Sequence, residues 1–504
     1  MASPAPRHAR RAAAAVLAAS ALALASCSAP GDEATQDASG ATLEVGLVLE
    51  PTNLDIRHTA GAALEQALIG NVYEGLVARS GADIVPALAT EWSVSDDGLE
   101  YTFTLAGDVT FHGGQDMTAD DVVASLEAVR GDETAIGHDE LAGVAEVAAI
   151  DEGTVRVALA EPDQGFLFAL TGPAGLVLDA DDETDMLSDA NGTGPFALES
   201  WNQGDSIVLA RNDAYWGDPA GVAEVVLRYI PEPTALVAAG LDGSLDALTG
   251  IDAELAPQLE GSFAVTSGPT TDKFILAFNE EAAPLDDVRV REALRLAIDH
   301  DAIVEVVGAG VTQFGPVPEL DPGYEDLSDT IAYDPERARD LLAEAGVEDL
   351  SLELTIPSAY GTTVSTLLVS AFADIGVELE VSPVEFSTWL QDVYTNHDYE
   401  LSYVNHVEPR DFSTWTDADY YYAIADDEAR AEIADTYAEA MRETDPDASA
   451  ALIADAARLV AAQHPADWLY TREDVVAVAT GVEGFPTSET STRLPLAGVS
   501  VAGS

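Results

Sequence analysis

The sequence has almost no cysteine and almost no lysine. Among its 504 residues, Cys27 is the only cysteine and Lys273 the only lysine. One cysteine cannot form a disulfide within the chain, so the fold must be stabilised without one. A chain of this length buries a large fraction of its surface, and we expect that burial to supply the stability. The lone thiol stands near the N-terminus, so no cysteine nucleophile is available to the rest of the chain.

Cations of both kinds are scarce. Lysine and arginine together number 21, against 91 aspartates and glutamates, which gives a formal net charge of −70. Nucleic-acid binding needs clustered cations, so we expect no nucleic-acid partner. An anionic membrane surface would repel the chain for the same reason. We interpret the acidity as a solvated surface, typical of a salty habitat, rather than as a dedicated cation-binding feature.

Catalytic and metal-binding signatures are missing as well. The sequence contains no G-x-x-x-x-G-K-[ST], no H-E-x-x-H and no G-x-S-x-G motif. Its histidines are scattered, and none pairs with another at the spacing of metal ligands. Paired carboxylates are so frequent in this acidic chain that they carry no signal. We therefore predict a protein that is not an enzyme and has no cofactor and no metal.

The N-terminus has the layout of an export signal. Residues 1–26 contain no acidic residue; a basic start at 7–11 precedes an apolar run at 12–26. That run is shorter than the roughly 20 apolar residues that span a bilayer, and no second long run follows. The sequence Leu-Ala-Ser before Cys27 resembles the lipobox of bacterial lipoproteins, which implies that Cys27 is acylated and anchors the exported protein to the outer face of the cell membrane. Residues 27–41 are small and polar, and we expect a flexible tether there.

Strand and helix patterns alternate along the rest of the chain. Apolar residues at alternate positions predict strands, and apolar residues at helical spacing predict helices. This mixture predicts an α/β fold. The predicted strands are 43–49, 101–105, 154–159, 206–210, 225–230, 274–279 and 352–356, and the predicted helices are 61–78, one beginning at 118, 287–307, one beginning at 334 and ending at 346, 363–374, 426–442 and 447–462.

Many collinear motifs resemble the family 5 extracellular solute-binding proteins, the oligopeptide, dipeptide and nickel receptors of ABC importers. The resemblance covers nearly all of residues 42–480. It is carried by 71–76 (NVYEGL), 86–105 (PALATEWSVSDDGLEYTFTL), 109–114 (VTFHGG), 118–122 (TADDV), 192–196 (GTGPF), 211–216 (RNDAYW), 287–299 and 333–335 (YDP).

The resemblance implies a periplasmic-binding-protein-like type II fold, with two lobes around a cleft and an extra domain in the first lobe. The first lobe would comprise 42–78, 194–279 and 481–504, with 79–193 as its extra domain; the second lobe would comprise 280–480. The chain would hinge where it crosses between lobes, and ligand would stabilise the closed state. A monomer of this kind delivers a captured solute to the permease and ATPase subunits of an importer and performs no covalent chemistry.

The charge clamps of a dipeptide receptor are missing from the expected cleft. Peptide-binding members hold the ligand's amine with an acidic residue three positions before an acidic-Pro pair. Here that pair begins at Glu408 and the matching residue is Asn405, which accepts a hydrogen bond more weakly than a carboxylate. The loop 356–363 also lacks the arginine that dipeptide receptors carry for the ligand's carboxylate. The predicted ligand-contacting residues are Asn53, Tyr360, Trp389, Asn405, His406, Glu408, Arg410, Asp411, Trp415 and Tyr420.

The sequence leaves the ligand class open. An oligopeptide is the first candidate, because the family is mostly peptide-binding. A neutral or modified ligand such as an oligosaccharide is the second, with aromatic residues as platforms, and a nickel chelate is the third. A sensing lipoprotein of the same fold would bind in the same way without import. An extracellular hydrolase has no supporting nucleophile and base.

Overall fold

The structure is a computed structural model that describes residues 40–502. The predicted signal peptide, Cys27 and most of the predicted tether lie outside these residues. Within the described part, no helix is long and apolar enough to cross a membrane.

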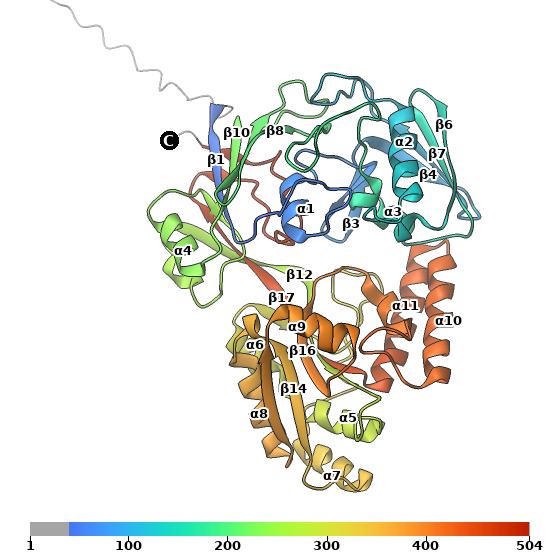
Figure 1. Ribbon diagram of the computed structural model, residues 1–504, viewed down its shortest axis with the longest axis vertical. Helices are drawn as coiled ribbons and strands as arrows, with labels where there is room; N and C mark the ends of the chain where they lie inside the picture. The colour runs from blue at the N-terminus through green and yellow to red at the C-terminus, as the bar shows by residue number, and fades with distance from the viewer. Residues whose placement is uncertain (1–39, 503–504) are drawn as a thin grey trace, which may run out of the picture. The chain divides into compact units, whose positions relative to one another are not determined.

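A mixed sheet of eleven strands runs through the described chain (Figure 1). Ten strands form a continuous path, and a short eleventh strand, β13 (Gly310–Thr312), pairs with β17 beside that path. In sheet order the ten are β15 (Glu378–Val384), β14 (Ser351–Pro357), β16 (Leu401–His406), β12 (Phe263–Phe278), β17 (Ala466–Ala479), β11 (Ala247–Leu248), β1 (Thr42–Leu47), β10 (Glu224–Tyr229), β9 (Ser206–Arg211) and β8 (Phe196–Asn202).

The strands β12 and β17 connect the two halves of this sheet. They pair antiparallel over most of their length, with a register shift between Pro269 and Lys273. Because successive side chains of a strand point to opposite faces, Leu276 packs into the core around α5 (Val288–Leu296), while Ile275 packs into the core that holds Trp468. At their other ends the same strands contribute to separate apolar cores around β1 and α4 (Pro233–Leu241). The pair therefore links cores that are otherwise separate.

A four-stranded antiparallel sheet lies within the predicted extra domain. Its order is β4 (Ala89–Val94), β5 (Glu100–Leu105), β7 (Thr154–Leu159) and β6 (Val144–Asp151). The helix α2 (Ala119–Gly131) packs against it in one core. This helix begins at Thr118 as the capping pattern predicts, since the Thr118 backbone N–H donates to the Asp121 carboxylate at 2.8 Å. Two short hairpins, β2 (Val77–Ser80) with β3 (Asp83–Pro86) and β18 (Val482–Glu483) with β19 (Ser500–Val501), complete the strands.

Most predicted helices are present, and two predictions are wrong. The remaining helices are α1 (Ala62–Leu68), α3 (Phe166–Ala169), α6 (His300–Val307), α7 (Pro335–Ala345), α8 (Thr363–Asp374), α9 (Phe386–Trp389), α10 (Asp427–Arg442) and α11 (Pro446–Gln463). The predicted helix 61–78 stops at Leu68, because Ile69 is extended and Gly70 adopts a positive φ of 78°. The predicted helix 287–307 is two helices, because Asp299 caps a new start by accepting a hydrogen bond from the Ala302 N–H. The division into lobes by residue number stays a prediction.

Candidate ligand-binding cleft

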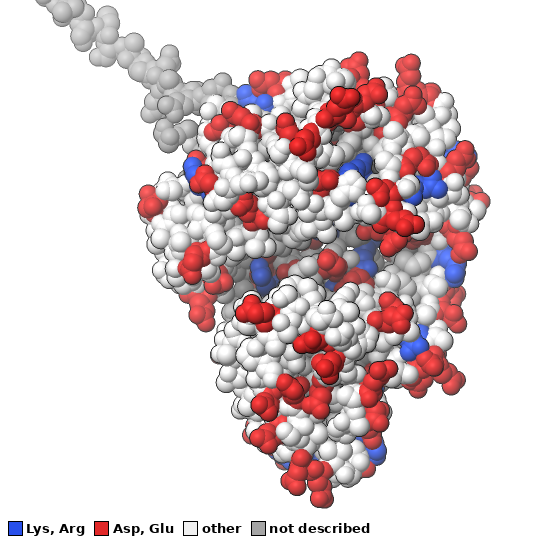
Figure 2. Space-filling model, viewed as in Figure 1, with Lys and Arg blue, Asp and Glu red and all other residues white. Residues whose placement is uncertain are grey.

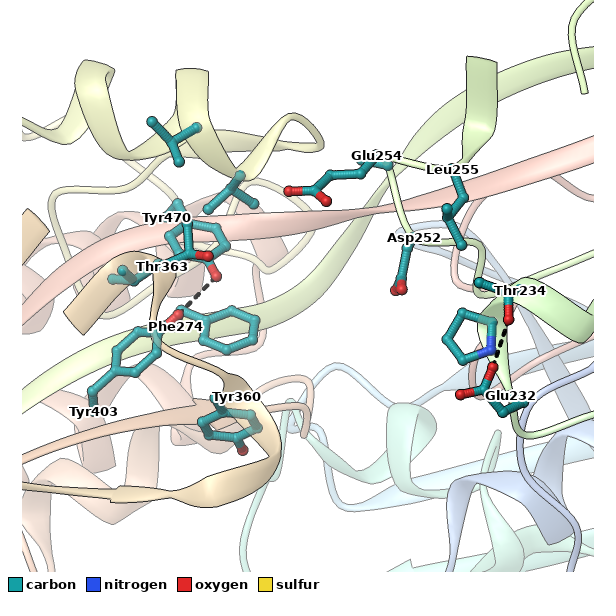
Figure 3. A pocket seen from close by; sticks show the side chains of 15 residues that line it. Glu232, Thr234, Asp252, Glu254, Leu255, Phe274, Tyr360, Thr363, Tyr403 and Tyr470 are labelled. Atoms are coloured by element: carbon teal, nitrogen blue, oxygen red, sulfur yellow. Dashed lines mark hydrogen bonds between the residues drawn. The ribbon is translucent and has the colours of Figure 1, made fainter. Parts of the chain in front are cut away.

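A cavity among the described residues has a volume of about 540 Å³ and is lined from two sides. One side consists of residues 232–234, where α4 begins, and the loop 252–255. The other side consists of strand residues from β12, β16 and β17 together with residues 306–307 and 360–364 (Figure 3). Figure 2 shows that the visible face is hollowed between the upper and lower parts of the molecule. A cavity of this size suits a small-molecule or short-peptide ligand.

An aromatic wall, defined here as Phe274, Tyr360, Tyr403 and Tyr470, forms one side of this cavity. The Phe274 ring stacks on Tyr470 with centroids 4.7 Å apart, and Tyr360 meets Phe274 edge-on at 5.6 Å. The hydroxyls of Tyr403 and Tyr470 share a hydrogen bond of 2.9 Å. Burial raises the pKa of Tyr470 to about 12, so this phenol stays protonated at neutral pH. The wall therefore presents neutral aromatic side chains to a ligand.

Two predicted site residues meet at this wall. Tyr360 lines the cavity, and the Asn405 backbone N–H donates to the Tyr360 hydroxyl at 3.4 Å. Asn405 lies opposite Phe274 in the register of β12 and β16. Its side-chain Oδ1 is buried and has no hydrogen-bond partner among the described residues, which leaves an acceptor available to a ligand.

A buried carboxylate adjoins the same place. Asp272, on β12, is 4% exposed and forms no ion pair within the described chain. Burial raises the pKa of Asp272 to about 6. The charge of Arg472 and a hydrogen bond from the Asn405 side chain lower the pKa, but by less than burial raises it. A carboxylate therefore lies on the strand next to position 405, where the resemblance leads us to expect an acidic residue.

The predicted residues of the loop after β16 already have partners within the protein. The Asp411 carboxylate pairs with the Lys273 Nζ at 3.0 Å, and the Glu408 carbonyl accepts from the same ammonium at 3.0 Å. The Arg410 guanidinium lies 3.9 Å from the centroid of the Phe168 ring, at the edge of a much smaller cavity. These charges hold the loop together, and their contact with a ligand stays a prediction.

The predicted aromatic residues lie mostly in the interior. Trp389 is 3% exposed and donates to the Ser402 hydroxyl, while Trp415 is 1% exposed and stacks on Tyr422 at 4.1 Å. His406 Nε2 lies 2.7 Å from the Tyr421 hydroxyl, and the half-buried Tyr420 packs against the same cluster. None of these residues lines the large cavity. Their roles as ligand contacts stay predictions.

Asn53 also has a local structural role. Its Oδ1 accepts from the Asp55 N–H and from the Thr59 hydroxyl, both at 2.9 Å, which closes a turn after β1. It does not line the large cavity, and its contact with a ligand stays a prediction.

Fourteen of the fifteen residues that line the cavity were not predicted from the sequence, and six of these carry its other aromatic rings and its carboxylates. Three belong to the aromatic wall, and three are the carboxylates of the opposite side. Phe274 lay in a predicted strand, whereas no strand was predicted at Tyr403 or Tyr470, and only the order β16-β12-β17 brings the three together. The six are Phe274, Tyr403, Tyr470, Glu232, Asp252 and Glu254.

The described residues contain no cluster of potential metal ligands. No group of three or more His, Cys, Asp or Glu side chains there is arranged to hold a metal ion. The cavity walls instead offer π faces, hydroxyls and carboxylates, which bind a solute by complementarity without changing it.

Solved structures share this architecture over almost the whole chain. A peptide complex of the periplasmic binding protein DppA from Helicobacter pylori superposes with a TM-score of 0.77 and 23% identity, covering 93% of this chain and 99% of the other. The substrate-binding protein CtaP from Listeria monocytogenes gives a TM-score of 0.83 with 18% identity, covering 92% and 100%. These likenesses confirm the predicted α/β periplasmic-binding-protein fold, with two lobes around a cleft.

Sequence comparison identifies relatives. Heme-binding protein A from Haemophilus influenzae is 31% identical over 315 residues, 55% of this chain and 56% of the relative. The dipeptide-binding protein of Escherichia coli is 28% identical over 61% of this chain and 65% of the relative. Each of these two matches thus spans less than two thirds of this chain and less than two thirds of the relative. Di/tripeptide-binding protein 2 from Pseudomonas aeruginosa is 30% identical over 68% of this chain and 72% of the relative.

A family model also matches the chain. Residues 83–429 match the bacterial extracellular solute-binding proteins, family 5 (middle region). This stretch includes the four-stranded sheet, α4, all of β12 and the predicted cleft loop after β16. The chain is a member of the family 5 bacterial extracellular solute-binding proteins, a family of binding proteins and not of enzymes.

Proposed function

We propose that the protein is the substrate-binding lipoprotein of an ABC importer, and that it captures an oligopeptide in the cleft and delivers it to a membrane permease. The observation that carries this proposal is the cavity lined from two sides, by residues 232–234 and 252–255 and by the aromatic wall. A ligand that contacts both sides favours their approach, because it binds the closed arrangement better than the open one.

The β12–β17 pair is suited to act as the hinge. Between Pro269 and Lys273 the register of the pair shifts, and side chains replace part of the regular ladder. The Thr270 hydroxyl donates to the Arg472 carbonyl at 2.6 Å and accepts from the Asp272 N–H at 3.0 Å. An interrupted ladder bends at lower cost than a regular one, so this segment supports closure close to the aromatic wall.

Peptides are the preferred ligand class on two grounds. Two of the relatives described above are named for di- or tripeptide binding, and the Helicobacter pylori structure holds the peptide STSA. In this chain, the free Oδ1 of Asn405 and the hydroxyl of Tyr360 offer polar contacts beside apolar ring faces. Short peptides need that combination, because backbone groups alternate with side chains along their length.

Native mass spectrometry of the protein purified from its own host tests the ligand. We expect a ladder of bound masses that fragment as peptides, and a bound sugar or metal chelate would contradict the proposal. Small-angle scattering tests closure: adding the identified peptide should lower the radius of gyration and raise the melting temperature. Deletion of the gene should abolish uptake of that peptide, whereas unchanged uptake would point to a sensing role.

A further inference from the structure

The two sides of the large cavity differ in chemistry. Opposite the aromatic wall stand Glu232, Asp252 and Glu254, which we call the acidic side (Figure 3). All three are exposed, and Figure 3 shows the Asp252 and Glu254 carboxylates projecting from the loop towards the cavity. The only polar contact that the structure gives any of these carboxylates is the Thr234 hydroxyl, which donates to Glu232 at 2.7 Å. Acidic residues are common throughout this chain, so these three are distinguished by their position on one side of the cavity and not by their number.

No cation balances these carboxylates inside the cavity. The fifteen lining residues include no lysine, arginine or histidine. Lys273, beside the wall on β12, is 2% exposed and engaged by Asp411. Arg472, two positions beyond Tyr470 on β17, lies 3.6 Å from the Asp474 carboxylate and does not line the cavity. The charged residues that line the cavity are therefore all acidic.

A second observation, independent of the acidic side, comes from behind the wall. Asp272 keeps a carboxylate 96% buried near Tyr360 with no ion-pair partner in the described chain. The charges of Arg472 and Lys273 and a hydrogen bond from Asn405 stabilise this carboxylate only in part, since burial still raises its pKa. The buried, unpartnered Oδ1 of Asn405 adds a further acceptor at the same end. Both groups suit a donor that carries positive charge.

From these features we infer that the ligand carries a guanidinium or ammonium group on a side chain, seated between the aromatic wall and the acidic side. Aromatic faces attract cations through the ring quadrupole, and the attraction grows as water is excluded. Closure of the cleft would bring the carboxylates towards the same group and exclude water from it. This inference rests on the proposed function, and it narrows the peptide class to those with an arginine or lysine side chain.

The test compares ligands that differ in one charge. Isothermal titration of the full-length protein in detergent would use the tripeptide Ala-Arg-Ala and its analogue with citrulline, a neutral urea of nearly the same shape, in place of arginine. Agmatine, a guanidinium without peptide bonds, is the third probe. We expect the arginine peptide to bind about tenfold more tightly than the citrulline peptide, since a desolvated cation–π contact with a nearby carboxylate is worth that much.

The double variant Asp252→Asn, Glu254→Gln should reduce this preference to about threefold or less, because only the wall then selects the cation. Both residues are exposed, so folding should not suffer. The matched control is Glu432→Gln, Asp435→Asn on α10, which removes the same charge from exposed positions outside the cavity and should leave the preference unchanged.

The outcomes separate the inference from the proposed function. Equal binding of the two peptides would overturn the cationic ligand and leave the peptide receptor standing. Binding of agmatine without either peptide would support the cationic ligand and overturn the peptide receptor. No binding of any probe, or an equal loss of preference in the control variant, would overturn the inference.

Discussion

Lys273, the only lysine of the chain, is buried beneath the loop after β16. Its ammonium lies 3.0 Å from an Asp411 carboxylate oxygen and donates to the Glu408 carbonyl. Its charge also acts on Asp321, whose pKa burial raises and Lys273 lowers. We expect Lys273→Met to reduce the free energy of unfolding by about 3–5 kcal/mol, because it leaves buried carboxylates without a counter-charge. Urea denaturation followed by circular dichroism measures this loss.

An exposed ion pair provides the control for Lys273. Arg337 pairs with Glu344 at 2.7 Å on α7, and both side chains are about half exposed. Arg337→Met should cost less than about 1 kcal/mol, because water and salt screen such pairs. Equal losses in the two variants would show that the Lys273 pair is no more important than a surface contact.

Asp272 should make stability depend on pH in a defined direction. Burial raises its pKa to about 6 from 3.8, so the folded protein binds this proton more tightly than the unfolded chain. The charged carboxylate therefore costs stability above pH 6, and the cost declines as the pH falls through 6 towards 3.8. Asp272→Asn should stabilise the protein by up to roughly 3 kcal/mol at pH 7.5, and this gain should shrink by about 2 kcal/mol at pH 4.5.

Urea denaturation at the two pH values measures this difference, and Asp435→Asn is the control. Asp435 is exposed on α10, so its substitution should change stability little at either pH. A gain from Asp272→Asn that is the same at pH 7.5 and 4.5 would contradict a carboxylate with a raised pKa. A gain that follows the expected pH dependence would mean that the protein keeps a costly charge beside the cleft, as a binding role requires.

At the scale of elements, the turn before β8 depends on glycine. A Cβ on Gly194 would lie 2.3 Å from the Asn71 carbonyl oxygen, which is backbone and cannot move aside. The Gly194 N–H donates to the Val72 carbonyl at 3.0 Å, so the close approach is maintained by hydrogen bonding. Gly194→Ala should reduce the free energy of unfolding by at least about 2 kcal/mol. Gly107→Ala, with open space around its Cβ, is the control and should be nearly neutral in the same melts.

Local sequence patterns predicted elements where the signals for their ends were strong. The helix α7 begins at Pro335 because Asp334 accepts from the Arg337 N–H, and it ends at Gly346 in a left-handed conformation, as predicted. The pattern failed at residues 297–299, where apolar spacing continues through a helix break. Asp299 was the available signal, since an aspartate in mid-helix competes for backbone hydrogen bonds and favours a cap.

At the scale of the whole molecule, the fold was predictable and the site only partly so. Collinear motifs such as 192–196 form buried turns in which backbone segments lie close together. These turns belong to the fold and stay the same when the ligand differs. The cavity instead depends on which strands are neighbours, and β16, β12 and β17 are far apart in sequence. Tyr360 was predicted because it lies in a cleft loop. The acidic side was missed because carboxylates cover the chain, as Figure 2 shows for the visible face.

The charge of the whole molecule also determines how it can stay at a membrane. With 91 acidic residues against 21 cations, the protein is repelled by anionic headgroups, so we expect acyl chains on Cys27 to hold it there. Each buried CH₂ contributes about 0.8 kcal/mol, so two or three chains suffice. Cys27→Ser should therefore move the protein from the membrane fraction to the soluble fraction in its own host, while Ser28→Ala should not. The released protein should keep its ligand-induced thermal shift, because the cleft residues lie more than 200 positions beyond Cys27 in the chain. If the serine variant sediments with membranes at high salt, an attachment other than lipid must hold it.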